Sequence, residues 1–162
     1  MRKPLSLVAR TVCDLFAWFL IIFGVYVIIH GDVTPGGGFQ GGAIVGSFMA
    51  LLLVAHGGDR VLEWVKASIY WIMLFVGLMM FIGFGLRGIP EGAFFYNFLA
   101  VPHDVAKTMA HGLIPFSGTI GVMDIAVGIE VAGGLTVIIL SMFRGIVLHD
   151  FADSRKETGH DG

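Results

Sequence analysis

Charged side chains are scarce in this chain. Its 162 residues include 10 Lys or Arg and 12 Asp or Glu, so that 14 % are charged, whereas 56 % are hydrophobic. A soluble globular domain has about 25 % charged residues, and the shortage here excludes a solvated surface around most of the chain. The net charge of −2 provides no basic surface for nucleic acid. The composition is therefore typical of a membrane protein.

Cysteine is almost absent, since Cys13 is the one such residue. A single cysteine excludes an internal disulfide and cannot hold an iron–sulfur cluster. The six histidines complete no metal-ligand cluster of familiar spacing. The serines have no nucleophile-and-base signature around them. We therefore expect no metal, no cofactor and no enzymatic activity.

Long hydrophobic runs, in contrast, recur along the chain. About 20 predominantly apolar residues cross a bilayer as a helix, and four such runs occur at approximately 12–30, 38–56, 66–86 and 120–143. The predicted fold class is an all-α membrane protein with four transmembrane helices. We expect residues 1–148 to form a single integral membrane domain and residues 149–162 to form a polar cytoplasmic tail.

The segment between the third and fourth runs is expected to lie at the membrane surface. Residues 94–98 read FFYNF, and aromatic side chains favour that surface. The following VPHDVAKTMAHG reads as a short helix that opens near Pro102 and stops at Gly112. Its His111 is a candidate for a proton relay.

Basic residues predict the orientation. With four spans, one side receives eight Lys or Arg residues, namely Arg2, Lys3, Arg10, Arg60, Lys66, Arg144, Arg155 and Lys156. The other side receives Arg87 and Lys107. Because loops rich in Lys and Arg stay in the cytoplasm, we expect both termini to be cytoplasmic in a cell-membrane protein.

The stretch HGDVTPGGGFQGG, residues 30–42, places five glycines between Gly36 and Gly42. It includes Gly36-x-Gly38-x-x-Gly41, the spacing of a dinucleotide-binding loop. Such a loop follows a strand of a βαβ unit, whereas long apolar runs flank this one on both sides. We therefore exclude dinucleotide binding.

Small residues recur at every fourth position of the second run, at Gly38, Gly42, Gly46 and Ala50. On a helix they share one face, and small residues let another helix approach closely in lipid. We predict that this stripe is a helix-packing face.

The residues before the stripe favour a second interpretation. In this interpretation, Thr34, Pro35 and the glycines form a non-helical entry into the second span. Their free backbone groups then line a polar cavity, to which Gln40 adds a side chain. Thr34 followed by Pro35 also fits a helix N-cap with proline at the first helical position. Thr34 and Gln40 are therefore candidates for an ion passage.

A family resemblance rests on TPGGGFQGG, which contains Pro35, Gly36, Gly37 and Gly41, and on the late segment HGLIPFSGTIGVMDIAVGIEVAGGLTVIIL. Both resemble the B subunit of the multi-subunit Mrp-type sodium/proton antiporters. The resemblance covers nearly the whole chain. It implies an accessory membrane subunit with other antiporter subunits and lipid as partners, and Na+ and H+ as the transported ions.

Two alternatives stay open. The same module recurs in membrane-bound hydrogenases and related respiratory complexes, where it would serve an assembly that couples redox chemistry to ion movement. A purely structural membrane scaffold, with no part in conduction, is the second alternative.

Two acids lie inside the fourth run. Glu130 is about 15 Å along the helix from Ile120, near mid-bilayer, where an ionisable group needs a partner or a proton. It is either a cation or proton contact in an ion passage, or it is half of an interhelical pair or a carboxyl kept neutral by desolvation. Asp124, one turn from Gly128 on a stripe of small residues, is a second passage candidate, and its six-residue separation turns it away from Glu130. Asp14 is expected to be a hydrated carboxylate at the membrane surface.

Overall fold

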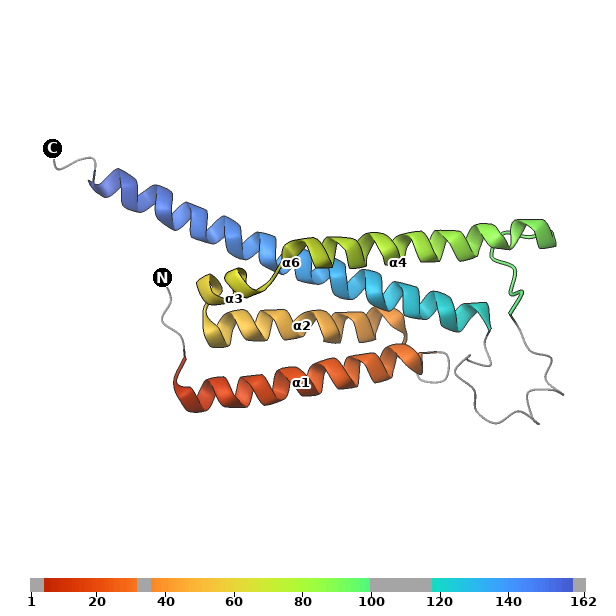
Figure 1. Ribbon diagram of the computed structural model, residues 1–162, viewed down its shortest axis with the longest axis horizontal. Helices are drawn as coiled ribbons and strands as arrows, with labels where there is room; N and C mark the ends of the chain where they lie inside the picture. Colours follow the sequence, from red (N-terminus) through yellow and green to blue (C-terminus); the bar gives the residue numbers. More distant parts are fainter. Residues whose placement is uncertain (1–4, 32–35, 100–117, 159–162) are drawn as a thin grey trace.

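A computed structural model describes residues 5–31, 36–99 and 118–158. Its helices are α1 (Leu7–Ile29), α2 (Gly38–His56), α3 (Gly58–Trp64), α4 (Ala67–Arg87), the 3-10 turn η1 (Ile89–Glu91) and α6 (Thr119–Thr158) (Figure 1). Four of them, α1, α2, α4 and α6, are long and apolar enough to cross a membrane. The predicted all-α fold with four transmembrane helices is confirmed, and the described residues contain no strand.

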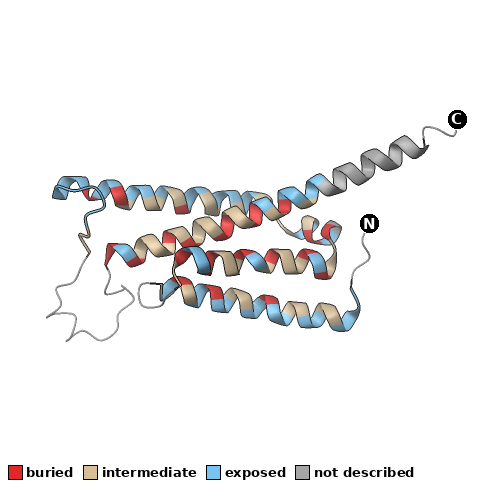
Figure 2. Ribbon diagram, turned by 180° about the vertical axis from the view of Figure 1, so that it is seen from behind, coloured by how far each residue is buried: buried red, intermediate tan, exposed pale blue. Residues whose placement is uncertain are grey.

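The four spanning helices pack in the order α1, α2, α6, α4, which differs from their order in the chain. α1 packs on α2, α2 packs on α6, and α6 packs on α4, so that α6 lies between α2 and α4 (Figure 1). Buried residues gather on α2 and α6, where Met49 and Leu140 are almost inaccessible (Figure 2). The outer helices α1 and α4 leave large apolar side chains such as Ile22 and Phe75 exposed. Such surfaces face lipid or neighbouring subunits in a membrane.

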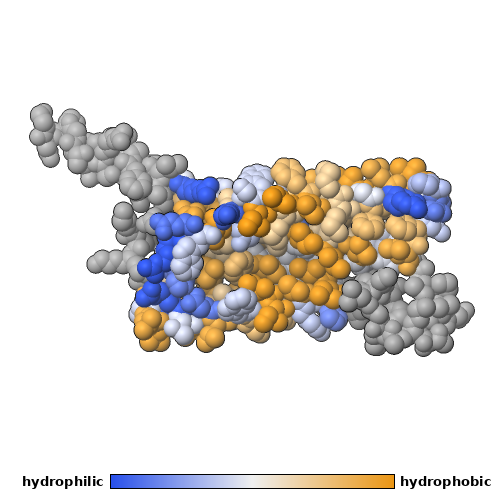
Figure 3. Space-filling model, viewed as in Figure 1, coloured by the Kyte–Doolittle hydropathy of each residue, from blue (hydrophilic) through white to orange (hydrophobic). Residues whose placement is uncertain are grey.

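The two ends of the bundle carry different groups. α1 begins, α2 ends and α4 begins at one end, which holds Arg10, Arg60 and Lys66 and which we call the basic end. The opposite end holds the last residues of α1, the first of α2 and the end of α4 with Arg87. Figure 3 shows hydrophilic residues toward both ends and a broad apolar band between them. This distribution suits a bundle whose middle lies in lipid.

The short helix α3 lies between the second and third spans, where the sequence analysis predicts no helix. Gly57 adopts φ 82 and ends α2, which turns the chain into α3. Val61 of α3 is 4 % exposed and joins the apolar cluster of Met49, Leu53 and Leu140. A helix of seven residues is too short to show a hydrophobic period, so burial of Val61 decides its position.

Aromatic residues after α4 fold back onto the end of that helix. Phe95 contacts Phe81, Phe98 stacks on Phe84, and the Arg87 guanidinium lies 5.3 Å from the Phe98 ring centre. The backbone N–H of Thr119 donates to the Asn97 side-chain oxygen at 2.8 Å, which ties this segment to the start of α6. The predicted helix around His111 lies outside the described residues.

Candidate functional site

The start of α2 is built around glycine. α2 begins at Gly38, and its N-cap Gly37 has φ 114, a left-handed conformation that residues with a side chain rarely adopt. The interpretation of Thr34 as N-cap and Pro35 as first helical residue is therefore wrong. Thr34 and Pro35 themselves lie outside the described residues. The physical reason is that Gly37 adopts the left-handed conformation of the turn before α2, while a carboxylate on another helix accepts from the first free backbone N–H of α2.

That carboxylate belongs to Asp124 of α6. Its Oδ1 accepts a hydrogen bond of 2.7 Å from the backbone N–H of Gly38, and its side chain lies beside Gly31 and Gly37. A Cβ atom on Gly31 would overlap the carboxylate, and one on Gly38 would overlap the Asp124 carbonyl oxygen. Because the N-terminus of a helix carries partial positive charge, it attracts the negative carboxylate. We call this group of residues, Asp124 with Gly31, Gly37 and Gly38, the Asp124 site.

The glycine stripe of α2 faces α6 below the Asp124 site. A Cβ on Gly42 would lie 2.6 Å from the Gly128 carbonyl oxygen, and one on Gly46 would lie 3.1 Å from the Leu135 Cβ. The two helix backbones thus approach closely, as small residues allow in lipid.

A second glycine contact joins α2 to α1, and the sequence analysis did not find it. A Cβ on Gly41 would lie 2.7 Å from the Gly24 carbonyl oxygen and 2.6 Å from the Ile28 side chain. Ile28 also covers Gly128 of α6, so the three helices meet around this one side chain. Gly24 and Gly41 are both buried, but nothing in their spacing indicates that they face each other.

Glu130 lies on a different side of α6, against α4. Its Cβ and backbone N are 2.7 Å from the position that a Cβ on Gly77 would take. Within the described residues, no hydrogen bond or ion pair joins the Glu130 carboxyl to another side chain, and it is only partly exposed. The structure thus brings Asp124 to α1 and α2, and Glu130 to α4.

Of the remaining candidates for the ion passage, Gln40 lies within the described residues. Gln40 is exposed, with its Oε1 3.5 Å from the position of a Cβ on Gly37, close to the Asp124 site. His111 lies outside the described residues. Within the described residues, no three His, Cys, Asp or Glu side chains come together as metal ligands.

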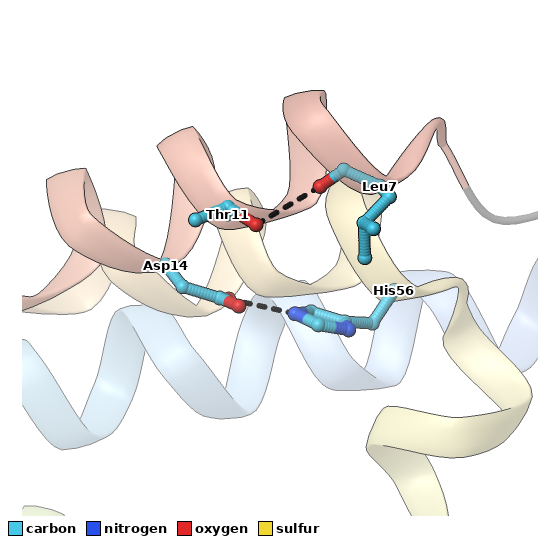
Figure 4. Close-up of polar contacts among 4 residues, drawn as sticks. All are labelled: Leu7, Thr11, Asp14 and His56. Atoms are coloured by element: carbon cyan, nitrogen blue, oxygen red, sulfur yellow. Dashed lines mark hydrogen bonds and ion pairs between the residues drawn. The ribbon is translucent and has the colours of Figure 1, made fainter.

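One polar contact was missed by the sequence analysis. The His56 Nε2 lies 2.6 Å from the Asp14 Oδ1, and this pair joins the end of α2 to α1 at the basic end (Figure 4). Thr11, one turn earlier on α1, instead donates to the Leu7 carbonyl oxygen of its own helix. The signal available in the sequence is that both Asp14 and His56 are polar residues in mainly apolar runs.

Four apolar helices that meet through glycine and enclose acidic side chains define a multi-pass α-helical membrane protein. Residues 8–137 match the family described as "Domain related to MnhB subunit of Na+/H+ antiporter". Since the match covers most of the chain, this protein belongs to the MnhB family of sodium/proton antiporter subunits. The resemblance seen in TPGGGFQGG and the late segment is confirmed.

Relatives occur in bacteria and archaea. The chain is 29 % identical over 143 residues to the "Putative antiporter subunit mnhB2" of Staphylococcus aureus strain MRSA252, covering 88 % of this chain and 98 % of that protein. It is 36 % identical over 78 residues to the same-named protein of strain Newman, and this match covers 48 % of this chain and 55 % of that protein. An uncharacterized protein of Methanocaldococcus jannaschii is 27 % identical over 126 residues, which cover 72 % of this chain and 44 % of the archaeal protein.

Proposed function

We propose that this chain is a non-catalytic accessory subunit of a sodium/proton antiporter assembly, in which it helps hold the assembly together and contributes a polar group to an ion passage. The names of the staphylococcal relatives support the assembly. The observation that carries the passage is Glu130, a partly buried carboxyl midway along a membrane-spanning helix without a partner among the described residues. Ionisable groups at that depth occur mainly in ion and proton pathways.

The two acids of α6 then have separate roles. Asp124 holds the start of α2 against α6 through the Gly38 N–H, so it keeps Gln40 and the first residues of α2 in place at one end of the passage. Glu130 takes up and releases H+ or Na+ deeper in the membrane. Other antiporter subunits are the partners, and their helices cover part of the exposed faces of α1 and α4.

Replacing Glu130 tests the passage. We expect Glu130→Ala and Glu130→Gln to lower coupled transport to about a tenth or less, because a passage needs a group that can carry charge or a proton. Glu130→Asp should keep part of the activity. Transport is measured in vesicles, and the amount of assembled complex by blue-native electrophoresis.

The exposed Glu63 of α3 provides the matched control, since Glu63→Gln removes one carboxylate outside the spanning helices. It should leave both measurements unchanged. Normal transport in a fully assembled Glu130→Ala complex would leave the structural scaffold as the function.

The hydrogenase-type host is tested separately by the genes next to the one for this chain. We propose the antiporter because its subunits supply the names of the relatives. Hydrogenase or iron–sulfur subunits encoded alongside would instead identify the respiratory host.

A further inference from the structure

A cavity of about 450 Å³ lies between α1, α2 and α3 at the basic end, away from Asp124 and Glu130. Apolar side chains, among them Ile21 and Phe48, line the part of the cavity that is deeper in the bundle. Asp14, His56 and Arg60 line the part nearer the basic end, each from a different helix. The cavity is therefore amphipathic along the bundle axis.

The polar groups of this cavity are only partly matched to one another. Asp14 uses one carboxylate oxygen for the His56 contact, yet its side chain stays 44 % exposed, whereas that of His56 is 17 % exposed. Arg60 is exposed, and no ion pair joins it to Asp14 in the described part of the chain. One negative and one positive group thus line the same cavity without neutralising each other.

The cavity also carries side chains that favour a membrane surface. Trp18 of α1 and Trp64 at the end of α3 line it, and Trp favours the boundary between headgroups and acyl chains. The adjacent band of the bundle is apolar, and hydrophilic residues cluster at this end (Figure 3).

We propose that this cavity binds a phospholipid whose headgroup carries both a phosphate and a primary ammonium group. The phosphate contacts the Arg60 guanidinium, the ammonium donates to the Asp14 carboxylate, and an acyl chain lies against Ile21 and Phe48. A purely anionic headgroup would place a second negative charge near Asp14. A quaternary ammonium has no N–H with which to donate to it.

Site-specific crosslinking tests the proposal in the whole assembly. The photoreactive amino acid p-benzoylphenylalanine replaces Trp64 in the cavity or, as a matched control, the exposed Trp71 of α4, which does not line it. The assembly is reconstituted in vesicles of equal parts phosphatidylethanolamine, phosphatidylglycerol and phosphatidylcholine. Mass spectrometry of the intact chain after illumination identifies each lipid adduct.

At position 64 we expect phosphatidylethanolamine adducts to exceed either other lipid about tenfold, the ratio expected from one charge-assisted hydrogen bond. At position 71 adducts should follow the vesicle composition. Asp14→Asn should bring position 64 to the vesicle composition, and Arg60→Gln, a change at an exposed residue, should lower all lipid adducts there. Three results at position 64, with Asp14 and Arg60 unchanged, would each overturn the proposal. They are lipid adducts in the proportions of the vesicle, an excess of phosphatidylglycerol adducts, and crosslinks to another subunit in place of lipid.

Discussion

The two acids of α6 meet different surroundings although only six residues separate them. Asp124 receives a backbone N–H and the positive end of α2. Glu130 lies beside Gly77, and α4 has no charged residue before Arg87 that could pair with it. An ionised carboxyl at mid-membrane costs about 3 kcal/mol or more. Glu130 therefore needs a proton, a bound cation or a group from another subunit.

Changes at Asp124 should act on stability before transport. Asp124→Ala removes a hydrogen bond that involves a charged group, with an expected loss of about 1.5–3 kcal/mol. Asp124→Asn keeps an acceptor oxygen for the Gly38 N–H and should lose less, since it gives up mainly the attraction to the helix dipole. Thermal unfolding of the assembled complex in mild detergent tests this: the unfolding temperature should fall from the original chain to Asp124→Asn and further to Asp124→Ala. Equal unfolding temperatures for the original chain and Asp124→Ala would show that the Gly38 contact contributes nothing.

At the scale of elements, α2 is a helix with two glycine faces. Gly38, Gly42 and Gly46 face α6, while Gly41 meets Gly24 of α1. The two faces point in different directions around α2, so the backbone of α2 lies close to the backbones of both α6 and α1. This explains why a chain tolerates so many glycines in one segment although each weakens a helix by about 1 kcal/mol.

A matched pair of glycine substitutions tests the contact of α2 with α6. Gly42→Leu inserts a side chain where the Gly128 carbonyl and Val131 already lie, and overpacking of this kind costs about 1–3 kcal/mol or more. Gly83→Leu makes the same change on α4, where a Cβ would meet no described atom within 4 Å. We expect the amount of assembled complex on blue-native gels to fall for Gly42→Leu only. Equal amounts for both variants would contradict the packing role.

At the scale of the whole molecule, the basic end and the opposite end suggest how the bundle is oriented. The lipid-facing band separates them (Figure 3), and Arg10, Arg60 and Lys66 belong to the basic end. Because segments rich in Lys and Arg are retained in the cytoplasm, we propose that this end is cytoplasmic.

Cysteine labelling of intact cells tests this orientation. In a chain with Cys13→Ala, a membrane-impermeant thiol reagent should label Glu91→Cys, at the opposite end. It should label Glu63→Cys, at the basic end, only after the membrane is made permeable. Both positions are exposed, so accessibility within the subunit does not bias the comparison. The reverse pattern of labelling would mean that the termini face outward.

The sequence by itself determined the four spans. A predominantly apolar run of about 20 residues crosses the bilayer as a helix, because a single segment satisfies all its backbone hydrogen bonds there only in that conformation. α2 begins and ends where its run does, and α4 differs from its predicted range by one residue at each end, whereas α1 begins five residues earlier, at Leu7, and α6 continues past residue 143 to Thr158. The period of four at Gly38, Gly42 and Gly46 likewise defines a face without any knowledge of the fold.

Only the tertiary structure decided what each face meets. Asp124 and Gly38 are 86 residues apart, and Asp14 and His56 are 42 apart, and such pairs form only when the depth and rotation of two helices are both set. α3 also depends on tertiary burial, since Val61 has its apolar partners on α2 and α6. A residue period follows from the geometry of one helix, whereas a contact follows from the packing of several, and close packing depends on every side chain between them.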